Sequence, residues 1–281
     1  MPTSRTRTTA LEVAKTPSPV LVTVTTLFTF WLVRFGTDLL YPLIGIDPKT
    51  KWTLWAYTAH VSTWYVLLPL AVLMGLHGLS QGWRQLGWQA NIKQGVYIAF
   101  LMSLPMLIGF ASLFELVDLT GRRIWVNLYV GALWAGVSEE TFFRAFILGQ
   151  LYRYGRWPFG LAVLSQAVLF GVSHLHQAHS LGQAVSIFTV TALGAAWFGW
   201  LWLAWRNLWV PIFLHALMNA WWLLFTTDPT AVGSWVSNGC RALTIGVSIW
   251  LTLRELGRQG RSWMIWREGL EELSQRRIVS S

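Results

Sequence analysis

The chain has 281 residues, of which 54% are hydrophobic and only 12% are charged. This charged share is about half that of an ordinary soluble domain, and the chain repeatedly runs for about 20 residues with few charges, the length that spans a bilayer. These features exclude a soluble enzyme, and the net charge of +9 is explained by basic segments that meet anionic lipid rather than nucleic acid. The single Cys240 excludes an internal disulfide. We therefore expect a multi-pass integral membrane protein that binds no nucleic acid.

A polar segment, residues 1–18, opens the chain and lacks the short apolar core of a cleavable signal peptide. A series of apolar runs follows, which predicts an all-α fold, a polytopic transmembrane helical bundle of about eight spans. The fourth run is longer than a bilayer needs, so we expect it to tilt, to kink near Gly136 or to leave the membrane before Tyr152. The runs lie near Val20–Phe35, Thr53–Leu76, Gln94–Phe114, Ile124–Gln150, Pro158–Ser173, Leu181–Trp205, Leu208–Phe225 and Ser234–Leu253.

Basic residues gather in the connections after the second, fourth and sixth runs and in the C-terminal tail. By the positive-inside rule, both termini are predicted to be cytoplasmic. The tail alternates acids and bases around two tryptophans, which indicates either a surface helix on anionic headgroups or a solvated tail. The chain then divides into a polar segment 1–18, transmembrane helices in 19–123, a transmembrane core 124–226, a last helix in 227–253 and a basic amphipathic tail 254–281.

Two adjacent acids, Glu139 and Glu140, lie inside the fourth run, where Arg144 is the only other charge. A charged side chain at bilayer depth costs roughly 2.5–3.5 kcal/mol even on the most lenient scale. In a helix, Glu140 and Arg144 share a face at a spacing of four, whereas Glu139 is rotated by about 100°. We therefore expect a Glu140–Arg144 ion pair and an unpaired Glu139.

Polar residues also interrupt the fifth and seventh runs. His174 lies near the end of the fifth run, and His215 and Asn219 have the spacing of one helical face in the seventh. One membrane histidine by itself is usually a satisfied interhelical hydrogen bond. The three spans together carry carboxylates, imidazoles, an amide and a guanidinium, and exposing all of these to lipid costs far more than exposing one histidine. We therefore expect all of them to face one polar cavity between helices.

Such a cavity contains the groups that hydrolysis of a peptide bond needs: a base for water, and donors for the oxyanion. Glu139 is the candidate base because the neighbouring acid is already paired. His174 could share the water, while His215 and Asn219 could donate to the oxyanion. Glu139, His174 and His215 are equally a ligand set for zinc with one open position, and the residues alone leave this alternative open.

Three motifs in order carry a resemblance to a known family. They are Glu139-Glu140-Thr-Phe-Phe-Arg144 (EExxxR), Phe170-Gly-Val-Ser-His174 (FxxxH) and His215-Ala-Leu-Met-Asn219 (HxxxN/D). This pattern resembles the CAAX protease and bacteriocin-processing family of intramembrane proteases, also called the abortive-infection family, which includes type II CAAX prenyl proteases. The resemblance covers roughly residues 124–224, and the remaining spans rest on hydropathy alone.

The resemblance implies an endopeptidase that cuts near the C-terminus of a membrane-associated protein or peptide. It implies that Glu139 and His174 activate water and that His215 and Asn219 stabilise the oxyanion. Glu140, Arg144 and Phe170 would support them, without a tightly bound metal or other cofactor. His176 is similar to part of the histidine-rich motif of the prenyl-protein branch, but Gln177 and His179 do not complete it, so a prenylated substrate is not assigned.

Two other classes of function compete with this interpretation. A proton-coupled transporter would use buried glutamate, histidine and arginine as a relay. A non-catalytic scaffold or immunity protein could share the same fold. The amide of Asn219 argues against the relay, and the completeness of the three motifs argues against the idle scaffold.

Overall fold

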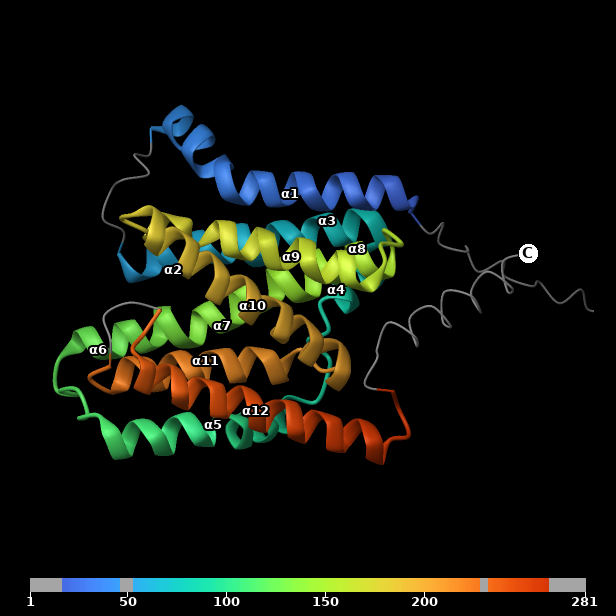
Figure 1. Cartoon of the computed structure of the whole chain (residues 1–281). Coiled ribbons are helices and arrows are strands. Elements are labelled where there is room, and N and C mark those ends of the chain that lie inside the picture. Colours follow the sequence, from blue (N-terminus) through green and yellow to red (C-terminus); the bar gives the residue numbers. More distant parts are fainter. Residues whose placement is uncertain (1–16, 46–52, 228–231, 263–281) are drawn as a thin grey trace, which may run out of the picture.

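The structure, a computed structural model, describes residues 17–45, 53–227 and 232–262. It is a bundle of helices that run side by side, with α1 at one edge and α5 and α12 at the opposite edge (Figure 1). Within these residues the only β-pairing is an isolated bridge between Leu116 and Phe225. The predicted all-α membrane bundle is confirmed.

The helices follow one another through short connections. The first half of the chain forms α1 (Pro19–Leu40), a 3-10 turn η1 (Pro42–Ile44), α2 (Leu54–Ser62), a π-helical segment η2 (Thr63–Leu67), α3 (Leu68–His77), α4 (Leu79–Gln85) and α5 (Ile92–Leu113). The second half forms α6 (Arg122–Asn127), π-helical η3 (Leu128–Trp134), α7 (Ala135–Glu139), π-helical η4 (Glu140–Leu148), α8 (Gly149–Arg153), α9 (Phe159–Ser173), a 3-10 turn η5 (Leu175–Gln177), α10 (Leu181–Trp205), α11 (Trp209–Leu224) and α12 (Trp235–Arg258).

All eight apolar runs are helical, but they differ in length and hydropathy. Five helices are long and apolar enough to span a membrane, and they correspond to the first, second, third, fifth and sixth runs. Of the other three, α11 is shorter, α12 continues to Arg258 beyond the predicted end, and the fourth run is divided among five helical segments. The predicted amphipathic tail lies outside the described residues from residue 263 onward.

The helix α12 is held by hydroxyl groups rather than by apolar contacts alone. Its buried face carries small polar residues, and three of them accept hydrogen bonds from other helices. Thr244 accepts from the backbone N–H of Met106 at 3.0 Å, Ser248 from the indole of Trp197 and Thr252 from the indole of Trp205. Such interhelical hydrogen bonds explain why a helix of low hydropathy packs against the edge of the bundle.

The long fourth run is accommodated by a change of helix type. Two π-helical segments, η3 and η4, flank α7. The backbone stays helical from α6 to α8, without a break at Gly136 or before Tyr152. In a π-helix the hydrogen bonds skip one more residue than in an α-helix, and such segments are rare and often occur at functional sites. All nine residues of η4 are buried, and its phenylalanines form the centre of the main hydrophobic core.

Candidate active site

The predicted ion pair between Glu140 and Arg144 is present in η4. Arg144 Nε lies 2.9 Å from Glu140 Oε2, and the side chains are only 1% and 0% exposed. The contact is an ion pair without the alignment of a hydrogen bond. The guanidinium also faces the rings of Phe170 and Phe198, with Cζ 4.7 and 5.4 Å from their centroids. Arg144 is therefore fixed by one carboxylate and two aromatic rings.

His215, on α11, lies between the two glutamates. Its Nδ1 is 2.8 Å from Glu140 Oε1, and its Nε2 is 3.9 Å from Glu139 Oε2. A carboxylate that is paired with arginine can only accept, so the Nδ1–H of His215 donates to Glu140. The Nε2–Oε2 separation is too long for a direct hydrogen bond. Glu139 is 24% exposed whereas Glu140 is fully buried, so Glu139 is the accessible acid of the pair.

His174 reaches the same region through an aromatic ring. It ends α9, where its Nδ1 lies 2.9 Å from the backbone carbonyl of Phe170. The rings of the two residues are 4.4 Å apart, and the Phe170 ring also faces Arg144. Within the described chain His174 makes no ion pair with Glu139. Since the carbonyl of Phe170 only accepts, Nδ1 of His174 carries a proton and donates it to this bond.

Asn219 lies one helical turn beyond His215 on α11. Its amide donates to the backbone carbonyl of Gly131 in η3 at 2.9 Å. This hydrogen bond uses one of the two N–H groups of the amide and fixes the orientation of the side chain. The second N–H of Asn219 stays available to a bound group.

Gly136 allows α7 and α11 to approach each other at the site. A Cβ atom added to Gly136 would lie 2.7 Å from the carbonyl oxygen of Ile212 and 3.2 Å from the Cβ of Ala216. Both contacts belong to the turn of α11 that carries His215. The sequence singled out Gly136 as a possible kink, but its role in the structure is close packing of two backbones.

We therefore expect Gly136→Ala to displace the turn that carries His215. The added methyl group should cost about 1–3 kcal/mol of stability as an overpacked contact, and it should lower activity further by separating His215 from Glu140. Gly194→Ala, within α10, is the matched control, since a Cβ there would meet no atom within 4 Å. Equal activity of the two variants would contradict this role of Gly136.

Two tyrosines on the second span were missed by the sequence analysis. Tyr57 and Tyr65 both interact electrostatically with Glu139, and Tyr65 packs edge-on against Phe142 at 5.2 Å. In the sequence, the signal for them is that two tyrosines lie eight residues apart in one apolar run. That signal is weak, because aromatic residues are common throughout the spans.

The arrangement differs from a zinc site. Within the described residues, no three histidine, cysteine, aspartate or glutamate side chains are gathered closely enough to hold a metal ion. Glu139 and His215 are neighbours, but His174 is directed onto the Phe170 carbonyl. As placed, the three side chains do not fit the ligand set that the sequence left open.

The comparisons with known proteins concern this same segment. Residues 121–221 match the model of the family described as "Type II CAAX prenyl endopeptidase Rce1-like", and this stretch contains every motif residue from Glu139 to Asn219. The chain is also 31% identical over 108 residues to the "putative membrane peptidase YdiL" of Bacillus subtilis (strain 168). That alignment spans 38% of this chain and 40% of the relative. No solved structure matches. The resemblance to the family is confirmed for this segment.

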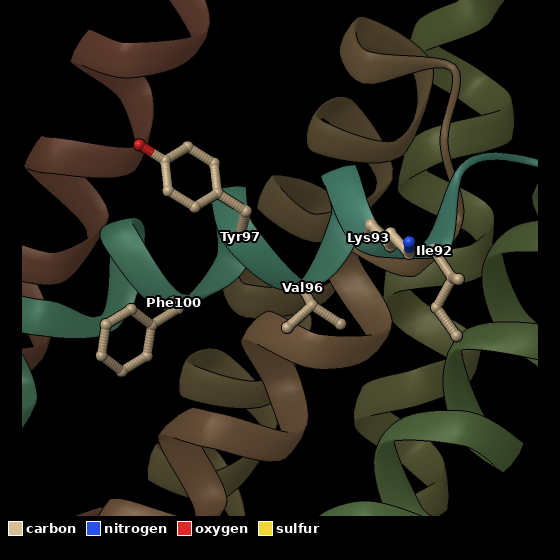
Figure 2. Close-up of a pocket in the computed structure, with 5 residues that line it drawn as sticks. All are labelled: Ile92, Lys93, Val96, Tyr97 and Phe100. Carbon is tan, nitrogen blue, oxygen red and sulfur yellow. The ribbon is translucent and has the colours of Figure 1, made fainter.

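A separate groove lies on the surface of α5, away from these residues. Figure 2 shows the side chains that line it, which are Ile92, Lys93, Val96, Tyr97 and Phe100. The lining is almost entirely apolar and includes none of the candidate site residues. The groove therefore contributes no group to the chemistry considered below.

Proposed function

We propose that the chain is an intramembrane endopeptidase that hydrolyses a peptide bond near the C-terminus of a membrane-associated protein or peptide. The observation that carries the proposal is His215, held between a buried, arginine-paired Glu140 and an accessible Glu139. The match to type II CAAX endopeptidases and the similarity to a membrane peptidase support a protease in general terms. The specific reaction and the substrate class are our inference.

Glu139 is the general base in this proposal. It removes a proton from water as the water oxygen attacks the scissile carbonyl, and the proton then passes to the leaving amine. Glu140 is unsuited to this task because Arg144 and His215 already occupy its carboxylate oxygens. The partial exposure of Glu139 gives water and substrate access to it.

His215 and Asn219 stabilise the oxyanion. With both glutamates ionised and Arg144 charged, a neutral His215 leaves the cluster with one excess negative charge, and an imidazolium makes it neutral. An imidazolium at this position has two N–H groups, so it can donate to Glu140 and to a bound oxyanion at the same time. Its Nε2–H then points to the region beside Glu139, where the tetrahedral intermediate would form. The second N–H of Asn219 is the other donor.

His174 positions the attacking water. Its Nδ1–H is engaged with the carbonyl of Phe170, so its Nε2 lone pair can accept a hydrogen bond from that water. The ring of Phe170, which faces both His174 and Arg144, would set the orientation of the imidazole. This accounts for the phenylalanine of the FxxxH motif.

The test separates hydrolysis from transport and from a metal mechanism. Purified protein in liposomes is mixed with quenched fluorescent apolar peptides that have free C-termini, and a pH-sensitive dye reports proton flux inside the vesicles. We expect fluorescence release without proton flux, and unchanged turnover after treatment with a chelator. Proton flux without cleavage would favour the transporter. Reversible loss of turnover on chelation would favour zinc, and inertness in both assays would favour the scaffold.

We expect Asn219→Ala to lower turnover by about 10²–10³, as removal of one oxyanion donor does, with little change in substrate binding. Turnover falls because the variant lacks the second N–H of the amide, the one that does not donate to the carbonyl of Gly131. The measurement is a comparison of kcat and KM for the same peptide. Asn238→Ala, on α12, is a control, since its amide donates to the carbonyl of Val232 and takes no part in the contacts described for the site. A rise in KM with unchanged kcat would contradict the assigned role.

A further inference from the structure

Phe198, on α10, contacts two groups of the candidate site and belongs to none of the three motifs. Its ring centroid lies 5.6 Å from that of the His215 imidazole, and the two planes are inclined by 36°, closer to stacking than to an edge-on contact. Arg144 Cζ lies 5.4 Å from the same ring centroid. A cation within about 6 Å of the face of an aromatic ring is attracted by it. The ring of Phe198 is therefore within reach of the Arg144 guanidinium and of His215 in its protonated form.

Phe170 makes contacts of the same kind. Its ring lies 4.7 Å from Arg144 Cζ and 4.4 Å from the ring of His174. Arg144 thus contacts two phenylalanines, and each of them also contacts one of the two histidines of the site. Phe170 begins the FxxxH motif, whereas no motif marks Phe198. The contacts of Phe198 with His215 match those of Phe170 with His174.

Close packing of α10 against η4 and α9 fixes the position of Phe198. A Cβ atom added to the next residue, Gly199, would lie 3.0 Å from Leu148 Cδ2 and 3.3 Å from Gln166 Nε2. The same Gln166 amide donates to the backbone carbonyl of Ala195 at 2.9 Å, one helical turn before Gly199. Phe198 itself is only 8% exposed. Its ring is therefore held against the site by the backbone of α10.

A phenyl ring is chemically suited to this position beside His215. The Nδ1 of His215 lies 2.8 Å from Glu140, and the proposed function needs its Nε2–H for the oxyanion. Another carboxylate beside the imidazole would accept that Nε2–H, whereas the side chain of Phe198 has no acceptor atom. The ring attracts the positive charge through its negative face and leaves the Nε2–H available.

We propose that Phe198 is a positioning residue that orients His215 and stabilises the positive charge that His215 carries when it donates to the oxyanion. The inference rests on the proposed function and deepens it, because it adds a residue that acts on the oxyanion donor. An interaction that is stronger in the transition state than with bound substrate raises kcat rather than lowering KM. The competing explanation is core packing alone, since Phe198 lies in one cluster with Met102 and Leu214.

The first test changes the charge distribution of the Phe198 ring and nearly keeps its shape. Phenylalanines with one, two or three ring fluorines replace Phe198 in the full chain, because fluorine withdraws charge from the ring face and weakens its attraction for a cation. Turnover of a quenched apolar peptide is measured in phosphatidylcholine nanodiscs. We expect kcat to fall stepwise, to about one tenth of the native value with three fluorines, and KM to stay nearly constant.

Phe110 is the matched control position for this series. It is fully buried, its ring lies edge-on against Phe114, Trp222 and Phe225, and it takes no part in the contacts described for the site. The same three fluorinated residues at Phe110 should leave kcat and KM unchanged. An equal fall in kcat at both positions would show a general effect of fluorination on the core and would overturn the inference.

A second test measures binding without cleavage. The probe is an apolar peptide in which an anionic phosphonate, a mimic of the tetrahedral intermediate, replaces the scissile amide. Its matched form is the neutral methyl ester of the same phosphonate. We expect the native chain to bind the anion more tightly than the ester, and three fluorines on Phe198 to reduce this preference by about tenfold.

The two tests separate the inference from the peptidase. If the native chain cleaves the peptide but neither kcat nor the phosphonate preference changes along the Phe198 series, the peptidase stands and Phe198 only fills the core. If the native chain cleaves nothing while fluorination of Phe198 weakens phosphonate binding, the positioning of His215 stands and the peptidase is wrong.

Discussion

Replacing Glu139 by glutamine is expected to lower kcat by about 10²–10⁴, the typical contribution of a positioned general base. The amide cannot accept the proton of the attacking water, although it keeps the shape of the side chain. Stability should change little, because Glu139 is partly exposed and takes no part in the Glu140–Arg144 pair. The measurement is turnover of a quenched peptide by protein in nanodiscs, together with the denaturation midpoint.

Glu115→Gln is the matched control for this change. Glu115 is an exposed acid in the connection after α5, so its loss alters the net charge equally without touching the site. We expect native turnover from the control. If Glu139→Gln stays within about tenfold of the native rate, Glu139 is not the base.

Replacing Arg144 by methionine is expected to destabilise the protein by about 3–5 kcal/mol, as when one partner of a buried pair is removed. The loss leaves Glu140, which is fully buried, with His215 as its remaining partner at 2.8 Å. It also removes the cation that faces Phe170 and Phe198. Denaturant titration in detergent micelles measures the stability, and turnover should fall in parallel.

The double variant Glu140→Gln with Arg144→Met separates charge from packing. The double variant should recover most of the stability that Arg144→Met loses. Its buried glutamine is uncharged, so no unpaired carboxylate is left without water. Turnover should stay low, since His215 loses the carboxylate that holds it. A single Arg144→Met variant with native stability would show that His215 alone compensates Glu140.

Much of the site could be predicted because charge in an apolar segment is a strong signal. The spacing of Glu140 and Arg144 predicted their ion pair, which survives the change from α- to π-helix. The cost of polar groups in lipid predicted that His215 would meet the glutamates. The sequence did not show which glutamate His215 prefers, because that depends on the rotation of α7 against α11.

The remaining features depend on contacts between distant segments. Gly136 is one of 24 glycines, and only the approach of Ile212 gives it a role. Tyr65 is brought to the site by the contact of its ring with Phe142, which no spacing in the sequence reveals. The π-helical segments were not expected, because no residue pattern distinguishes them from an α-helix.

The length rule predicted the helices well and their ends less well. Helix α1 continues to Leu40, five residues past the last predicted one, and α12 runs on to Arg258. Charged and polar residues at these ends lowered the hydropathy without ending the helix. The short α4 was missed because its seven residues are too few for a periodic pattern.

The most direct measurement of the central claim compares the C-termini of membrane proteins in cells that express the native chain or Glu139→Gln at equal levels. Hydrolysis at this site predicts shortened C-termini that accumulate with the native chain and disappear with Glu139→Gln. The same set of C-termini in both cell populations would contradict the assignment of Glu139, His215 and their partners as the active site of an endopeptidase.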